Sequence, residues 1–191
     1  QTHAQEVLLI SEYIEGSGNN KAIEIFNPNA TTVELDSYQI AQSSNGRGWA
    51  FYHTFPAGAK IAPFGTYVIL NDGVDTDLFN HANADEVLGF PSVVHHNGDD
   101  ARAIIHIGAT DTTFIDVFGD PDNDPGSGWA IGDSTTATKD HTIVRLSSIT
   151  AGNATPLASF GSDSTAAEWE VRGLNDFKDL GFHAFDNTPF S

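Results

Sequence analysis

The sequence predicts an all-β fold, a sandwich or a barrel, and three observations lead to this prediction. Short runs rich in β-branched and aromatic residues recur along the 191 residues. Gly, Pro, Asn and Asp separate these runs, as they do at the tight turns between strands. Helical periodicity, with apolar residues at every third or fourth position, is nearly absent. We therefore expect alternating apolar side chains to enclose an aromatic interior.

The first half of the chain supplies six of the expected strands. Each has β-branched or aromatic residues and ends near turn-forming residues. Asn45-Gly46 lies between the fourth and fifth segments, and Asp72-Gly73 follows the sixth. In chain order these strands are expected at Val7–Ile14, Lys21–Asn27, Thr32–Leu35, Tyr38–Gln42, Ala50–Thr54 and Thr66–Asn71.

The second half contains the clearest hairpin. Ala101–Ile107 and Thr113–Phe118 are two apolar runs joined by a short polar loop. A further strand is expected at Thr142–Leu146, after which residues 147–168 form a surface connection. The apolar Trp169 and Val171 then dock back on the body, and single helical turns are expected over residues 75–82 and 176–180.

Residues 1–191 are expected to form one domain, because sandwich domains commonly reach this length. A hydrophobic content of 39%, with 13 Phe and 3 Trp, is sufficient for a core. The sequence has no Cys, which excludes disulfides and thiolate metal sites, and no Met, which suggests a processed or excised part of a longer protein. The apolar runs are much too short to cross a bilayer.

The charge balance argues against polyanionic partners. Eight Lys and Arg stand against 26 Asp and Glu, which gives a net charge of −18. Nucleic-acid affinity depends on cationic side chains that displace counterions from phosphates, so direct binding to nucleic acid is disfavoured. Salt or divalent cations relieve such self-repulsion, so the charge suggests a saline or calcium-containing medium.

One acidic loop is a candidate calcium site. Asp120, Asp122 and Asp124 alternate in a tight Pro- and Gly-containing turn, and Ca²⁺ takes six to eight oxygen ligands. The loop is not an EF-hand, because its Gly comes one position late and Ile131 occupies the position of the bidentate Glu. The alternative is a solvated turn in which the Asp side chains accept backbone hydrogen bonds.

Glu12 is a second candidate metal ligand. In a strand at Val7–Ile14 it shares a face with Leu8, Ile10 and Ile14, which is the expected buried face. A buried carboxylate must be paired, hydrogen-bonded or protonated. We therefore consider a structural carboxylate, a metal ligand assisted by Glu15 or Asn27, and a catalytic group, and the sequence leaves all three open.

No catalytic centre is predicted. The sequence lacks a Gly-x-Ser-x-Gly elbow and a phosphate-binding loop, and the adjacent His95 and His96 have no spacing typical of zinc ligands. The best candidate for ligand contact is the stretch that contains Arg47, Trp49 and Tyr52, whose aromatic rings suit a sugar, a protein or single-stranded nucleic acid.

Several segments resemble the bacterial lamin tail domains found in secreted nucleases. The similar segments occur in the family's order, and they are ISEYIEGSGNNKAIEIFNP (10–28), NGDDARAIIHI (97–107), IDVFGDPDNDPGSGWAIG (115–132), HTIVRLSSITAGN (141–153), AAEWEV (166–171) and FKDLGFHAF (177–185). The resemblance implies an immunoglobulin-like sandwich, secretion, and a separate catalytic domain in the full-length protein. It provides no catalytic residues to transfer. The insert around His53–Ala84 and the extreme acidity depart from the family and leave room for an added binding face.

Three functions remain open at this point. The first is a binding module that holds an attached enzyme near a surface, a polymer or a partner, with calcium as a possible stabilising ion. The second is a stand-alone hydrolase that uses a divalent metal. The third is a structural spacer in a surface protein.

Overall fold

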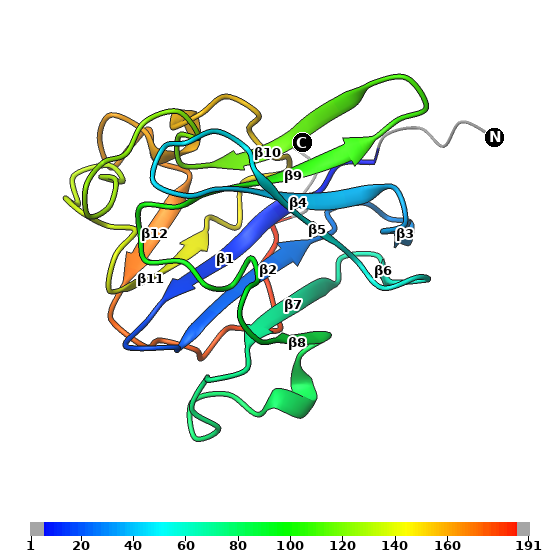
Figure 1. Ribbon diagram of the computed structural model, residues 1–191, viewed down its shortest axis with the longest axis horizontal. Helices are drawn as coiled ribbons and strands as arrows, with labels where there is room; N and C mark the ends of the chain where they lie inside the picture. The colour runs from blue at the N-terminus through cyan, green and yellow to red at the C-terminus, as the bar shows by residue number, and fades with distance from the viewer. Residues whose placement is uncertain (1–5, 187–191) are drawn as a thin grey trace.

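The computed structural model describes residues 6–186, and strands make up most of their regular structure. The larger of the two main sheets has the order β12-β11-β1-β2-β7-β8 (Figure 1). Its neighbours are antiparallel, except for β7 and β8, which are parallel. Its strands are β1 (Leu9–Glu15), β2 (Lys21–Phe26), β7 (Thr66–Asn71), β8 (Glu86–Leu88), β11 (His141–Arg145) and β12 (Trp169–Arg172).

The second sheet has the order β10-β9-β4-β5 and lies over the first (Figure 1). Its strands are β4 (Tyr38–Ser43), β5 (Phe51–Thr54), β9 (Ala101–Ile107) and β10 (Thr112–Phe118). A small ribbon pairs β3 (Val33–Glu34) with β6 (Lys60–Ile61), and the 3₁₀ helices are η1 (His81–Asn83) and η2 (Ala158–Phe160). The predicted all-β, immunoglobulin-like sandwich is therefore confirmed.

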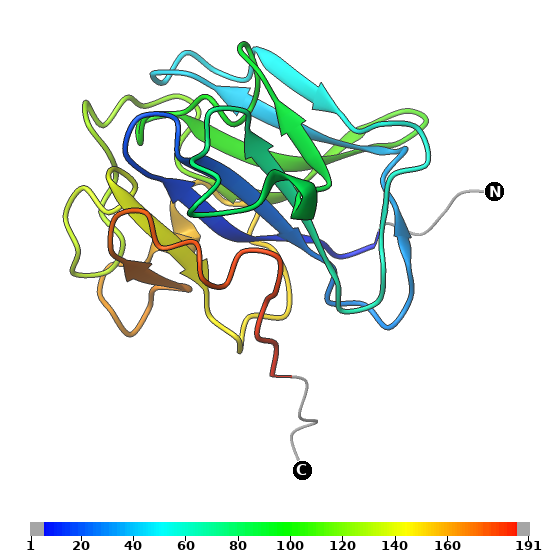
Figure 2. The ribbon, with the colours of Figure 1, turned by 90° about the horizontal axis from the view of Figure 1, so that it is seen from below.

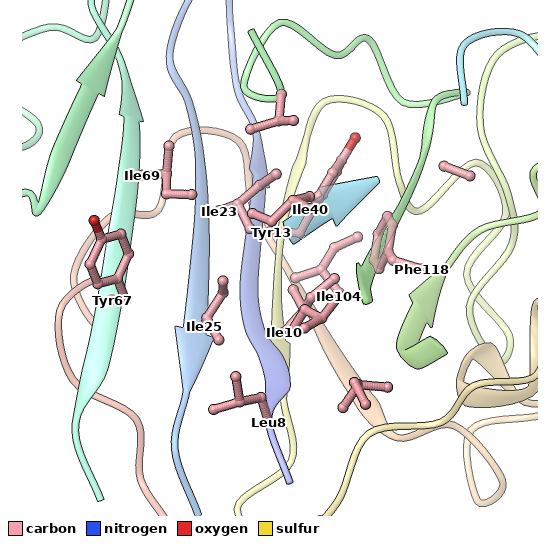
Figure 3. Close-up of a cluster of buried hydrophobic side chains, with 14 of the residues drawn as sticks. Leu8, Ile10, Tyr13, Ile23, Ile25, Ile40, Tyr67, Ile69, Ile104 and Phe118 are labelled. Carbon is pink, nitrogen blue, oxygen red and sulfur yellow. The ribbon is translucent and has the colours of Figure 1, made fainter. Parts of the chain in front are cut away.

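The core lies between the two sheets, as Figure 3 shows. Ile23 and Ile25 of β2 and Ile40 and Ile104 of the second sheet belong to one buried cluster. The ring of Tyr13 stacks on Phe118 of β10 with 4.2 Å between centroids. Aliphatic side chains from alternate strand positions thus close around an aromatic centre, as the sequence pattern predicts.

All nine expected strands are confirmed, each within two residues of its predicted bounds. The expected docking of Trp169 is also confirmed, because it begins β12 and is buried in the core. The short strands β6 and β8 were missed, since two or three residues carry no measurable alternation. The predicted helical turn over residues 75–82 is displaced, because Asn80 caps η1 only at residue 81.

The C-terminal segment, residues 174–186, crosses the outer face of the six-stranded sheet (Figure 2). Phe177 and Leu180 pack there against Ile14, Ala22 and Leu70. Both faces of β1 and β2 are consequently buried along their whole length. This arrangement encloses the polar side chains of the outer face, Glu12 among them.

A β-bulge corrects the predicted orientation of Glu12. Ile10 pairs with Ile25 while Glu12 pairs with Glu24, so Ser11 is one extra residue in β1. Leu8 and Ile10 therefore face the core between the sheets, whereas Glu12 and Ile14 face the C-terminal segment. The prediction that Glu12 shares a face with Leu8 and Ile10 is wrong, because the bulge reverses the alternation between them.

Candidate functional site

The outer face of the four-stranded sheet is a candidate contact surface. Strand register defines two rows of side chains that point away from the core across all four strands. One row contains Tyr52, Ala41, Ala103 and Val117, and the other contains Thr54, Gln39, Ile105 and Phe114. Together with Trp49, these residues are called the platform below.

Aromatic rings cover the middle of the platform. Trp49 and Phe114 pack against a cluster that contains Ala41 and Ala103, and their ring centroids are 5.6 Å apart. The two alanines leave space for rings to lie over the strands, which larger side chains would fill. Tyr52, which is 48% exposed, donates a hydrogen bond of 3.4 Å from its hydroxyl to the Trp49 carbonyl. The structure thus brings the predicted contact residues Trp49 and Tyr52 together.

The platform is uncharged, although the protein carries a net charge of −18. The charged residues Arg102 and Asp116 of this sheet lie on the alternate, inward rows and are fully buried. Amide and hydroxyl groups supply the polarity instead, since Gln39 Nε2 donates to Thr54 Oγ1 at 2.8 Å on the exposed surface. Arg47 is exposed in the loop before Trp49.

The acidic loop follows β10 and forms two local turns. Asp120 Oδ1 accepts the Asp122 N–H at 3.0 Å, and Asp124 Oδ1 accepts the Gly126 N–H at 2.7 Å. Asp122 and Asp124 are exposed. Among residues 6–186, no three His, Asp or Glu side chains gather closely enough to hold a metal ion. The calcium site at Asp120, Asp122 and Asp124 stays a prediction.

Glu12 and Glu15 are not brought together. Glu15 forms a buried ion pair with Lys21 and also accepts the Asp140 N–H. Three residues away on the same strand, Glu12 faces the C-terminal segment, and neither of its carboxyl oxygens has a hydrogen-bond partner. Burial, followed by the charge of Glu24, raises the pKa of Glu12 to about 9. Glu12 is therefore a neutral acid at pH 7.

Glu24 lies next to Glu12 in the register but has partners. Its carboxyl accepts from Ser11 Oγ at 2.6 Å and from the Gly181 N–H at 2.7 Å. Burial still raises the pKa of Glu24, to about 7. The two carboxyls occupy the covered outer face of the sheet, where Arg172 of β12 pairs with Asp179 of the C-terminal segment.

A buried ionic centre that no sequence pattern indicates joins the two sheets. Asp116 of β10 accepts from Arg145 of β11 at 3.0 and 3.3 Å and from the Ile10 N–H of β1 at 2.8 Å. The Asn153 N–H donates to it at 2.7 Å, and Arg145 also pairs with Glu168 at 2.6 Å. Ile115 is the extra residue of a second β-bulge, in β10. This bulge reverses the alternation of side chains and turns Asp116 toward the core.

His96 and His53 are held in structural contacts. His96 is fully buried, stacks on Tyr13 at 4.3 Å and has Nε2 2.8 Å from the Ile14 carbonyl, and burial holds its pKa well below the usual value. His53 of β5 pairs with Glu86 of β8 at 3.1 Å, where it links the edges of the two sheets. Neither ring lines one of the two cavities described next.

Two cavities of about 300 and 270 Å³ open at the surface. The larger lies beside β3 and is lined by Ser37, His106 and three carboxylates, but no hydrogen bond joins Ser37 to His106, whose ring meets Tyr38 edge-on. The smaller lies between β11, β12 and the C-terminal segment, where Arg145 and Arg172 are already ion-paired. Neither cavity contains an assembled nucleophile and base.

The comparisons with known proteins identify one family. A family model described as the Lamin Tail Domain matches residues 1–120. This range extends from the N-terminal strand through β10, so it includes the platform and both bulges. No curated protein matches the sequence. None of the helices within residues 6–186 is long and apolar enough to cross a membrane.

Proposed function

The chain belongs to the lamin tail domain family, whose members are immunoglobulin-like and generally non-catalytic, and from this premise we propose that it is a binding module. It supports or targets an attached enzyme, such as a nuclease, within a secreted or cell-surface bacterial protein. Its contact surface is the platform on the four-stranded sheet. The segments that resemble the lamin tail domains of secreted bacterial nucleases motivate the attached enzyme and the location.

The open, uncharged platform carries this proposal. Function in a binding module needs an exposed contact surface of suitable chemistry, whereas an acyl or phosphoryl transfer enzyme needs converging reactive groups. Tyr52 is about half exposed and donates to the Trp49 carbonyl, and the ring of Trp49 packs against Phe114. In contrast, Ser11 engages Glu24 on the covered sheet face and Arg145 engages Asp116 in the sandwich interior, while the unpartnered Glu12 is enclosed by the C-terminal segment.

The distribution of basic residues disfavours nucleic acid as the direct ligand. Lys21, Arg102 and Arg145 are buried. Arg172 is paired with Glu170 and Asp179, and Lys178 with Asp176. Of the eight cationic side chains, three remain to contact a phosphate backbone, and they are Arg47, Lys60 and Lys139. They lie in three separate segments of the chain and therefore do not form a basic patch on one element.

The catalytic alternative has a direct test. We expect the isolated chain to release no product from single- or double-stranded DNA, from RNA or from a chromogenic phosphate diester, with Mg²⁺, Mn²⁺, Ca²⁺ or Zn²⁺ present. Product formation that survives repurification and is lost in an active-site variant would refute the binding-module proposal and support the metal-dependent hydrolase.

Calcium is a second part of the proposal, supported by the spacing of Asp120, Asp122 and Asp124 and by the excess of acidic residues. If the loop binds Ca²⁺ with a dissociation constant of about 1 mM, 10 mM Ca²⁺ stabilises the fold by about 1.4 kcal/mol. We expect the melting temperature to rise by about 3–5 °C, and Asp122→Ala to remove most of this rise.

Calorimetry with NaCl at the same ionic strength separates binding from screening. Asp77→Ala is the matched control, because Asp77 is also an exposed loop carboxylate but lies in another loop. If Asp122→Ala responds to Ca²⁺ as strongly as the parent chain and the Asp77→Ala control do, the proposed calcium site in the loop of Asp120, Asp122 and Asp124 is refuted.

A further inference from the structure

We propose that the platform binds a neutral polysaccharide strand, an inference that rests on the proposed function and names its ligand class. The rings of Tyr52, Trp49 and Phe114 would stack on sugar rings, while Thr54 and Gln39 would contact hydroxyl groups. Each step of this inference follows from the register and the chemistry of the face.

The first step is the shape of the surface. The two outward rows cross β5, β4, β9 and β10. Their four aliphatic members are 2% exposed or less, so the accessible surface consists of Tyr52, Thr54, Gln39 and the partly exposed rings of Trp49 and Phe114. Neighbouring strands are about 4.8 Å apart, so each row extends over about 14 Å. β5 is an edge strand, and an extended polymer can therefore leave the platform on that side without meeting another strand.

The second step is the chemistry of the rings. One face of a pyranose ring presents C–H groups with partial positive charge, and the face of an aromatic ring carries the negative part of its quadrupole. Tyr52 is 48% exposed on an edge strand, and its hydroxyl is tied to the Trp49 carbonyl, which limits its rotation. The rings of Trp49 and Phe114 are 5.6 Å apart between centroids and inclined by 34°, and both are partly exposed.

The third step is the charge. Among the nine platform residues none is charged, in a protein with 34 charged residues of its 191. The net charge of −18 repels polyanions such as nucleic acids and uronate polymers. A cationic polymer would find no carboxylate among the platform residues. A neutral chain with many hydroxyls matches both the absence of charge and the exposed Gln39–Thr54 amide and hydroxyl groups.

A protein partner fits the platform less well. Most of its apolar side chains are already covered, because Ala41, Ala103, Ile105 and Val117 are 2% exposed or less. A stable protein interface removes about 800 Å² from each partner and concentrates apolar groups at its centre. The accessible part of the platform consists instead of ring faces and short polar groups, which suits sugars.

Tryptophan fluorescence provides a direct assay, because Trp129 and Trp169 are 6% and 5% exposed and Trp49 is the more accessible indole. Cellohexaose, laminarihexaose and mannohexaose are the neutral probes, with an alginate hexamer and a deoxythymidine hexamer as anionic probes. We expect a saturable blue shift with at least one neutral hexamer and none with the anionic ones.

Tyr52→Ala is expected to weaken that binding at least about tenfold, as removal of one stacking ring should. Phe182→Ala is the matched control, since Phe182 is 70% exposed but belongs to the C-terminal segment. Circular dichroism and the melting temperature confirm that both variants are folded. Thr54→Ala is the second test of the platform, because Thr54 is exposed on β5 and its replacement leaves the Trp49 reporter in place.

Three results of the binding assays with the hexamers overturn the polysaccharide inference. They are no spectral change with any neutral hexamer, equal binding by Tyr52→Ala and the parent chain, and binding of the deoxythymidine hexamer alone. Concentration-dependent self-association that Tyr52→Ala abolishes, without glycan binding, also overturns it and assigns the platform to a second copy. The binding-module proposal itself survives this last result, whereas product release by the isolated chain refutes it separately.

Discussion

Replacement of Glu12 by glutamine is expected to raise the free energy of unfolding by about 3 kcal/mol at pH 7. The Glu12 side chain is enclosed between β1, β2 and the C-terminal segment, with no hydrogen-bond partner for either oxygen. Glutamine has nearly the same shape and is neutral at every pH. Urea unfolding of both proteins between pH 4.5 and 9 measures the difference.

The sign follows from the two protonation states. Burial and the neighbouring Glu24 raise the pKa of Glu12 to about 9 in the folded protein, against 4.5 for the free side chain. The folded state therefore keeps a proton that the unfolded state releases above pH 4.5. Stability from this group is complete below pH 4.5 and is lost as the pH rises toward 9.

The other charges around Glu12 act in both directions. Arg172 lowers its pKa, while Asp176 and Asp179 of the C-terminal segment raise it. The Glu12→Gln variant should still lose stability as the pH rises to about 7, but less than the parent chain does. The remaining loss comes from Glu24, whose pKa is also raised in the folded protein. Glu34→Gln is the control, since Glu34 is exposed on β3. Identical pH profiles for Glu12→Gln and the parent chain would show that Glu12 is ionised and solvated.

The same carboxyls connect stability to the C-terminal segment. Gly181 donates its N–H to Glu24, and Asp179 pairs with Arg172. As Glu12 ionises, the charge repels Asp179 and favours separation of the segment from the sheet. Amide exchange should therefore accelerate first over residues 174–186 as the pH approaches 9, and more slowly in Glu12→Gln.

The alternation of apolar residues predicted the fold well, because it depends on local sequence alone. Lys21–Phe26 and Ala101–Ile107 have β-branched residues at regular positions and lie where they were expected. The bulge at Ser11 was not predictable in this way. An extra residue in one strand is defined only by its partner, and the register of β1 against β2 is a tertiary property.

The candidate site was predicted in part for the same reason. Trp49 and Tyr52 were selected because they are aromatic and close in sequence. Their neighbour Phe114 is 62 residues beyond Tyr52 and joins them only when β10 aligns with β9 and β4. Sequence spacing also gave no sign that the two rings would lie on a face without charges, because that property belongs to four strands at once.

Removal of the Asp116 carboxylate is expected to have the largest destabilising effect, about 3–5 kcal/mol for Asp116→Ala. Arg145 would then remain fully buried without its bidentate partner, and the N–H groups of Ile10 and Asn153 would lose their acceptor. A sequence pattern could not reveal this pair, because Asp116 and Arg145 lie 29 residues apart in different sheets.

A double-mutant cycle tests whether the two charges act as one unit. Asp116→Ala with Arg145→Met removes both charges, so we expect its loss of stability to be smaller than the sum of the single losses by more than about 1 kcal/mol. Lys178→Met is the control for a surface pair, since Lys178 is 66% exposed beside Asp176 and should change stability by less than about 1 kcal/mol.

The cycle also tests how the two sheets are joined. Asp116 receives the Ile10 N–H at the bulge of β1, and the bulge at Ile115 of β10 places it there. If the pair fixes the relation between the sheets, the double variant should retain β-structure but show faster amide exchange in both β1 and β10. Strictly additive losses with unchanged exchange would mean that the apolar core alone aligns the sheets and that the two bulges are independent.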